Sequence, residues 1–285
     1  MKLPGGWRGN SARHLSVMGL YLAVTLVMTL PVANTLTSQI IGEGGDPWQT
    51  MWRFEYKYEA LVNAATAGDL GLFLRQEFWG GGEPRLMNLS VWPWMPIYAA
   101  LGNPQGYNVV WLLSFFLTGY SAYLLLRWSL QEYAPTIVSP AQREWAAIIA
   151  GLYYMLLPYH VAHSLGHFGA MQLQWLPLLF LALGAWLKRP APGRTMALAA
   201  LFTMQVWIEH HYALWFVVAA LLWVGWQRRD IARAWRQAAF RQQLFVLLVL
   251  LFGITLPSIL PTLRLAAADT VLTLGAAQTT RFSAD

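Results

Sequence analysis

Charged residues are scarce in this chain. Only 11% of its 285 residues are Asp, Glu, Lys or Arg, whereas soluble domains average about a quarter. Cysteine is absent, which excludes a disulfide framework, thiol catalysis and cysteine-ligated zinc. The sequence also has no Asp-x-Asp pair, which argues against the mechanism of soluble glycosyltransferases that use nucleotide sugars.

Hydrophobic residues dominate instead. They make up 57% of the chain, which includes 16 tryptophans, and this composition is typical of an integral membrane protein. The net charge of +6 could suggest binding to nucleic acid. However, the basic residues form clusters between hydrophobic runs, as the positive-inside rule predicts for membrane proteins, so nucleic-acid binding is set aside.

The hydrophobic runs predict an all-α bundle with about seven membrane spans. They cover residues 14–36, 107–126, 145–159, 171–187, 195–226 and 244–263, and a short apolar piece at 91–101 precedes the second run. As one helix, residues 195–226 would extend for about 48 Å, which is well over a hydrocarbon core of about 30 Å. We therefore expect this run to cross twice, with a turn at Glu209, His210 and His211.

The charge distribution predicts the orientation. Basic residues flank the run 195–226 on both sides, at Lys188, Arg189 and Arg194 before it and at Arg228, Arg229, Arg233 and Arg236 after it. These flanks should be cytoplasmic, which places the N-terminus inside and the C-terminus outside. Residues 37–90 hold seven acidic and four basic residues, in keeping with an external loop, and residues 160–170 should also be external.

The external loop contains a helix signal, "GEGGDPWQTMWRFEYKYEALVNA", from Gly42 to Ala64. Asp46 is a good N-cap, with Pro47 at the first helical position. One stripe of the expected helix holds Trp48, Met51, Trp52, Glu55, Tyr58 and Val62. Residues 47–63 are therefore expected to form an amphipathic helix lying in the outer membrane interface. Asp46 could cap this helix, face an external cavity, or do both.

Histidines gather in the segments predicted to be external. His160, His163 and His167 follow the spacing i, i+3, i+7, which is one face if the segment is helical, and His210 and His211 follow Glu209 at the expected turn. These residues could simply populate the interface belt. Ionisable residues at membrane depth are otherwise candidates for a functional site, here one that lines a cavity or binds a divalent metal.

Four stretches resemble a known family: "GGDPWQTMWRFEY", "NPQGYNVVWLLSFFLTGYSAYLLLRW", "LPYHVAHSLGHFGAMQLQWLPLL" and "QVWIEHHYAL". Their order is similar to that in the C-type (GT-C) glycosyltransferases, and more closely to the bacterial YfhO-like and related membrane proteins. The GT-C enzymes take a sugar from a polyprenyl-phosphate donor in the outer leaflet of the plasma membrane. The resemblance covers nearly all of residues 15–285.

The resemblance implies roles for particular residues. Asp46 matches the carboxylate of the first external loop, which in this family is the candidate general base that activates an acceptor hydroxyl. Arg53 and Lys57, one turn apart, could bind the donor phosphate. Related proteins are usually longer, so residues 1–285 are expected to be a single transmembrane domain forming the N-terminal part of a longer protein. The acceptor would be an extracytoplasmic glycan or lipid of the cell envelope.

A second hypothesis belongs to a different class. Charge-poor membrane chains rich in tryptophan also serve as non-catalytic subunits, and helices interrupted by proline occur in transporters. An inverted repeat would favour a transporter component. The sequence shows none, because the first half has a long outer loop and the second half lacks one.

Overall fold

The computed structural model describes residues 11–78, 89–256 and 260. This part of the chain is helical and contains no β-strand. Its elements are α1 (Ser11–Met28), α2 (Leu30–Ala33), α3 (Asp46–Ala67), α4 (Leu70–Phe78), η3 (Leu89–Trp94), α5 (Met95–Leu101), α6 (Gln105–Tyr133), α7 (Pro140–Met155), α8 (Pro158–Ser164), α9 (Trp175–Lys188), α10 (Pro192–Ile208), α11 (His210–Trp226), α12 (Arg228–Trp235), α13 (Ala238–Leu250) and η4 (Leu251–Thr255).

Several of these helices are long and apolar enough to span a membrane, which supports the prediction of an all-α membrane protein. Among the described residues, α1, α6 and Ala238–Thr255 meet this criterion, and α7 with α8, bent by 41°, makes a fourth if the pair is one span. Helices α9 and α11 are apolar but shorter. The run 195–226 is broken at Glu209, between α10 and α11, as expected. Part of the predicted span 244–263 lies outside the described residues.

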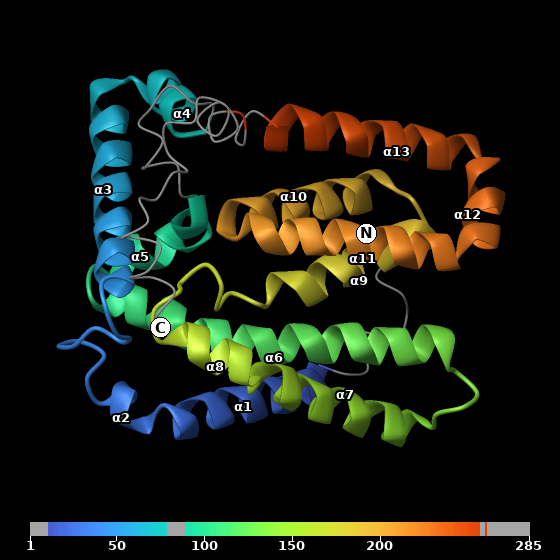
Figure 1. Ribbon diagram of the computed structural model, residues 1–285, viewed down its shortest axis with the longest axis horizontal. Helices are drawn as coiled ribbons and strands as arrows, with labels where there is room; N and C mark the ends of the chain where they lie inside the picture. The colour runs from blue at the N-terminus through green and yellow to red at the C-terminus, as the bar shows by residue number, and fades with distance from the viewer. Residues whose placement is uncertain (1–10, 79–88, 257–259, 261–285) are drawn as a thin grey trace, which may run out of the picture.

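The helices run between two ends of the molecule. In Figure 1, α1, α6, α7, α9, α10, α11 and α13 lie roughly along the long axis, whereas α3 crosses one end and α12 crosses the other. We call these the α3 end and the α12 end. The turn at Glu209 and the segment after α8 lie toward the α3 end, and the α6–α7 and α9–α10 connections lie at the α12 end.

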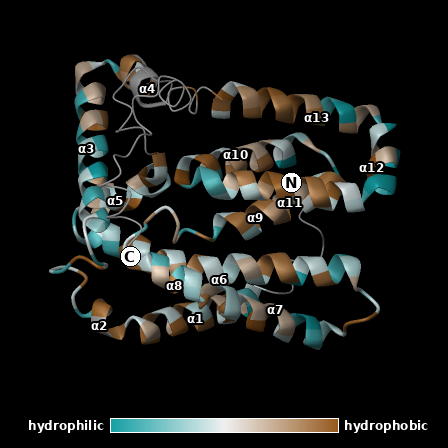
Figure 2. Ribbon diagram, in the orientation of Figure 1, coloured by the Kyte–Doolittle hydropathy of each residue, from teal (hydrophilic) through white to brown (hydrophobic). Residues whose placement is uncertain are grey.

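The two ends differ in charge. The α12 end carries the basic flanks of α9, α10 and α12, and Figure 2 shows α12 as strongly hydrophilic beside the apolar α11 and α13. The α3 end carries the acidic residues Glu43, Asp46, Glu55, Glu59 and Asp69. Such a separation of charge between the two ends is common in membrane proteins.

Helices α1, α6 and α7 pack closely around two glycines. A Cβ atom on Gly119 would lie 2.9 Å from the ring of Tyr21, and one on Gly151 would meet the Tyr21 hydroxyl and lie 2.6 Å from the Gly119 carbonyl oxygen. The buried Tyr21 hydroxyl donates a hydrogen bond to the Ile148 carbonyl at 3.0 Å. Small residues at this crossing let the helix backbones approach each other, as is common in membrane bundles.

Helix α3 begins differently from the prediction. Gly45, not Asp46, is the N-cap, and no side chain caps the helix. Gly45 already has helical dihedral angles, and its carbonyl accepts the first helical hydrogen bond from the Gln49 N–H at 3.0 Å. Asp46 is therefore one position inside the helix, and its carboxylate is free of the capping role.

The predicted apolar stripe of α3 divides between two surfaces. Trp48 and Trp52 are exposed, whereas Met51 and Tyr58 pack against the core. The buried positions of the helix are Pro47, Thr50, Phe54 and Lys57. A stripe drawn from the sequence could not separate an apolar face that meets protein from one that meets lipid headgroups, because both are hydrophobic.

Candidate functional site

A cavity of about 240 Å³ lies at the α3 end and collects several of the candidate residues. It is formed by the first two turns of α3, the segment after α8 and the junction of α10 with α11. Its lining residues are Asp46, Gln49, Thr50, Arg53, Ser90, Gly166, His167, Phe168, Gly169, Ala170, Ile208 and Glu209. Four candidates from distant parts of the sequence, Asp46, Arg53, His167 and Glu209, thus share one cavity.

Two glycines allow these segments to meet. Gly42, at a φ of +113°, lets the loop before α3 approach the end of α8, where the Glu43 N–H donates to the Leu165 carbonyl at 2.5 Å. A Cβ atom on Gly42 would lie 2.6 Å from that carbonyl oxygen. Similarly, a Cβ atom on Gly169 would lie 2.8 Å from the carbonyl oxygen of Ile208. Both approaches need glycine, and together they place Asp46, His167 and Glu209 around the cavity.

Asp46 and His167 face each other across the opening. The distance from the Asp46 Oδ2 to the His167 Nε2 is 3.9 Å, and the two side chains are 55% and 63% exposed. A carboxylate at such a position remains accessible to an incoming hydroxyl group, which a general base must reach within hydrogen-bond distance.

Glu209 is the N-cap of α11 and has two histidine neighbours. Its carboxylate accepts from the His211 N–H at 3.4 Å, and its Oε1 lies 2.6 Å from His211 Nδ1 and 4.0 Å from His210 Nδ1. One ligand atom from each of the three residues lies within 4.8 Å of the others. Imidazole and carboxylate groups suit several divalent metals, so this trio could hold one at the cavity's edge.

The two basic candidates on α3 lie in different surroundings. Arg53 is half-buried at the cavity wall, where burial lowers its pKa and the charge of Asp46 opposes this effect. Lys57 is buried inside the protein and lies outside the cavity lining, with its Nζ 5.7 Å from the centre of the Trp92 ring. Arg53 is therefore the better placed of the two to meet a ligand.

His160 and His163 do not share a helical face with His167, because α8 ends at Ser164. His160 is fully buried, with its Nδ1 2.7 Å from the Met155 carbonyl oxygen and its ring 4.3 Å from that of Phe115. His163 instead lies beside His167, with ring centres 5.0 Å apart. His160 thus belongs to the core, and His163 supports the cavity residue His167.

Sequence reasoning overlooked three polar residues of the lining, Gln49, Thr50 and Ser90. Two of them had a detectable signal. Asp46, Gln49, Thr50 and Arg53 follow the spacing i, i+3, i+4, i+7, which places them on one face of a helix. Ser90 is brought in by η3 and had no such signal.

The burial of Lys57 predicts an unusual pH dependence of stability. Burial, and then the charge of Arg53, lowers the pKa of Lys57 to about 7. Between this value and the ordinary 10.5, the unfolded chain binds more protons than the folded one, so stability should rise with pH. Unfolding temperatures of the detergent-solubilised protein should therefore increase from pH 7 to pH 9.

The variant Lys57→Met separates this effect from other titrations. It removes the buried ammonium and keeps an unbranched side chain. We expect it to raise the unfolding temperature at pH 7 and to flatten the rise toward pH 9. A variant whose pH profile is parallel to that of the parent would show that Lys57 is not the group responsible.

No known protein family, curated protein or solved structure matches the chain. We therefore infer a function from the chemistry of the cavity and from its place at the α3 end of an all-helical membrane protein.

Proposed function

We propose that the chain is a glycosyltransferase-like membrane protein that transfers a sugar from a polyprenyl-phosphate donor to an extracytoplasmic acceptor. The convergence of Asp46, Arg53, His167 and Glu209 on one cavity carries this proposal. The cavity is smaller than the roughly 300–1,000 Å³ of pockets for drug-sized ligands, so it suits a compact polar headgroup, with the polyprenyl chain remaining in the bilayer.

Each group has a part in this reaction. Asp46 takes the proton of the acceptor hydroxyl, whose oxygen forms a bond to the anomeric carbon of the sugar. The bond from this carbon to the phosphate oxygen breaks, and the electron pair leaves with polyprenyl phosphate. Arg53 binds the phosphate through charge-assisted hydrogen bonds, whereas Lys57 is buried outside the cavity lining. Within the described residues no carboxylate forms an ion pair with Arg53, so its guanidinium remains available.

The residues around Glu209 and His167 complete the site. His167 orients the Asp46 carboxylate, and His163 packs behind it, whereas His160 serves the core. A divalent metal, if the protein uses one, would be held by Glu209, His210 and His211, and would supply further positive charge near the phosphate.

The proposal includes an orientation in the bacterial plasma membrane. Helices α1, α6, α7 with α8, α9, α10, α11 and α13 would be the seven spans, with a cytoplasmic N-terminus. Helix α3 would lie in the outer interface, where the exposed rings of Trp48, Trp52 and Tyr56 suit the headgroup region. The donor sugar is presented at this surface.

Cysteine labelling tests the orientation directly, because the chain has no cysteine of its own. Ala65→Cys is exposed on α3, and Gly193→Cys has open space around its Cβ position at the α12 end. An impermeant thiol reagent applied to intact cells should label position 65 and spare position 193 until the cells are permeabilised. Labelling of position 193 alone in intact cells would reverse the assignment.

The function itself is tested by donor turnover. The full chain in proteoliposomes should release polyprenyl phosphate from polyprenyl-phosphate hexoses when envelope glycans or lipids are supplied as acceptors. A chain that folds and binds donor but never releases polyprenyl phosphate would favour the alternative of a non-catalytic subunit. A chain that does not bind the donor at all would refute the proposal.

A further inference from the structure

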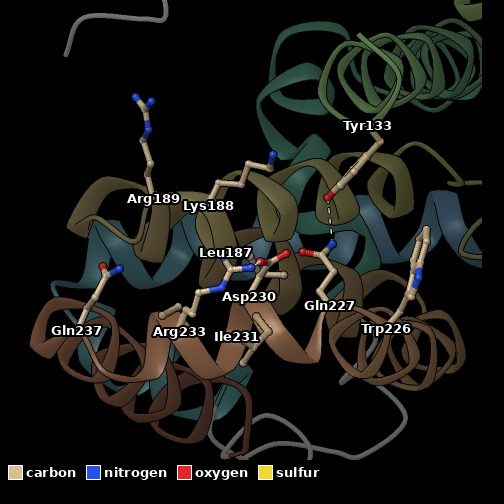
Figure 3. A pocket seen from close by; sticks show the side chains of 11 residues that line it. Tyr133, Leu187, Lys188, Arg189, Trp226, Gln227, Asp230, Ile231, Arg233 and Gln237 are labelled. Carbon is tan, nitrogen blue, oxygen red and sulfur yellow. Dashed lines mark hydrogen bonds and ion pairs between the residues drawn. The ribbon is translucent and has the colours of Figure 1, made fainter. Parts of the chain in front are cut away.

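The α12 end carries a larger cavity of its own. It has a volume of about 630 Å³ and lies where the ends of α6, α9 and α11 meet α12. Figure 3 shows its polar side chains, among them Lys188, Arg233, Asp230 and Gln227. A second depression of about 460 Å³ shares part of this lining and adds Arg228 and Arg229. The two hollows form one continuous basic surface.

Some of the charges on this surface are already balanced. Lys188 pairs with Glu132, and Arg233 pairs with Asp230 at 2.6 Å. In contrast, Arg189, Arg228 and Arg229 have no carboxylate within ion-pair distance in the part of the chain that the structure describes. Three guanidinium groups thus border the two cavities with their charge uncompensated, which favours an anionic ligand.

The surface also continues directly from the apolar helices. Trp226, which lines both hollows, is 81% exposed and is the last residue of α11. Trp235 at the end of α12 is 53% exposed. Exposed Leu221 and Leu222 precede Trp226 on α11. Tryptophan rings at the end of apolar helices mark the level of lipid headgroups, so the uncompensated arginines are at the depth of the lipid phosphates.

We propose that this surface binds the headgroup of an anionic phospholipid in the leaflet that the α12 end contacts. The phosphate accepts from Arg228 and Arg229, which line the smaller hollow, and Arg189 on the lining of the larger hollow adds positive charge to the same surface. The acyl chains extend along α11 past Trp226. Basic pockets between membrane helices at the end that faces the headgroups are suited to this class of lipid. The site is separate from the Asp46 cavity at the α3 end, and it does not depend on the proposed transferase activity.

Native mass spectrometry of the detergent-solubilised full chain, titrated with phosphatidylglycerol or phosphatidylcholine, tests this site. We expect retention of phosphatidylglycerol and little retention of phosphatidylcholine. Arg229→Gln should weaken phosphatidylglycerol binding about fivefold, and Arg228→Gln with Arg229→Gln about 25-fold, because each cation near a lipid phosphate contributes a similar amount. Arg229→Lys should stay within about twofold of the parent, since the charge is kept.

Arg236→Gln is the matched control. Arg236 is exposed near the end of α12 but lines neither hollow, so its loss should change binding less than twofold. Equal effects of Arg236→Gln and Arg229→Gln would contradict a specific site, because they would show that binding depends only on the total positive charge of this end. Equal retention of both lipids would overturn the proposal, and displacement of phosphatidylglycerol by millimolar inorganic phosphate would point to a soluble anion instead.

Discussion

Replacing Asp46 by asparagine is expected to reduce sugar transfer by roughly 10²-fold or more, with normal expression. The carboxamide has nearly the same shape but cannot take the proton of the acceptor hydroxyl, and general-base catalysis contributes about this much. Because Gly45 caps α3, the substitution costs the helix only the favourable effect of a negative charge in its first turn, about 0.3–1 kcal/mol. Release of polyprenyl phosphate from a labelled donor measures the effect.

Glu55→Gln is the control for this experiment. Glu55 is an exposed carboxylate of the same helix and lies outside the cavity lining. Its substitution removes the same charge and should leave the transfer rate within about twofold of the parent. Equal activity of Asp46→Asn and the parent would remove the catalytic role of Asp46, and an equal loss in both variants would indicate a general effect of charge.

The largest expected effect on stability comes from Gly151→Ala. The added methyl group would meet the Tyr21 hydroxyl and the Gly119 carbonyl oxygen, and backbone atoms cannot move aside cheaply. Overpacking of this kind costs about 1–3 kcal/mol, and loss of the hydrogen bond from Tyr21 to Ile148 adds about 1 kcal/mol. The unfolding temperature in detergent should therefore fall clearly below that of the parent.

Gly19→Ala shows what alanine does without this crowding. Gly19 is also inside a helix, α1, but a Cβ atom there would have no neighbour within 4 Å. Alanine is favoured over glycine in helices by about 1 kcal/mol, so this variant should match or exceed the parent. Two variants with the same unfolding temperature would show that α1, α6 and α7 do not pack as described.

The sequence predicted the apolar helices and the break at Glu209 because these depend on hydropathy and on the length of a membrane span. The seven-span count remains a prediction, since α9, α10 and α11 do not meet the criterion for spanning. The resemblance singled out Asp46. The proximity of Asp46 to His167 could not be predicted, because it depends on the tertiary contact between the Gly42 loop and Leu165.

Two differences between the sequence-based expectations and the structure have local causes. The sequence "GEGGDPW" contains both glycine and aspartate, and both are common N-cap residues. In the structure Gly45 is the N-cap. The spacing of His160, His163 and His167 predicts one face only while the helix continues, but α8 ends at Ser164. A cap or a helix end depends on tertiary contacts such as the bond from Glu43 to Leu165, which a helical pattern does not contain.

Photo-crosslinking of the donor tests whether its sugar binds in the cavity at the α3 end. A polyprenyl-phosphate sugar with a photoreactive group on the sugar would be irradiated with the full chain in nanodiscs, and the modified peptides mapped by mass spectrometry. We expect crosslinks in residues 46–53, 166–170 and 208–211, and we expect unlabelled donor to prevent them. Crosslinks confined to the α12 end would contradict the proposed function. The absence of any crosslink that unlabelled donor prevents would also contradict it.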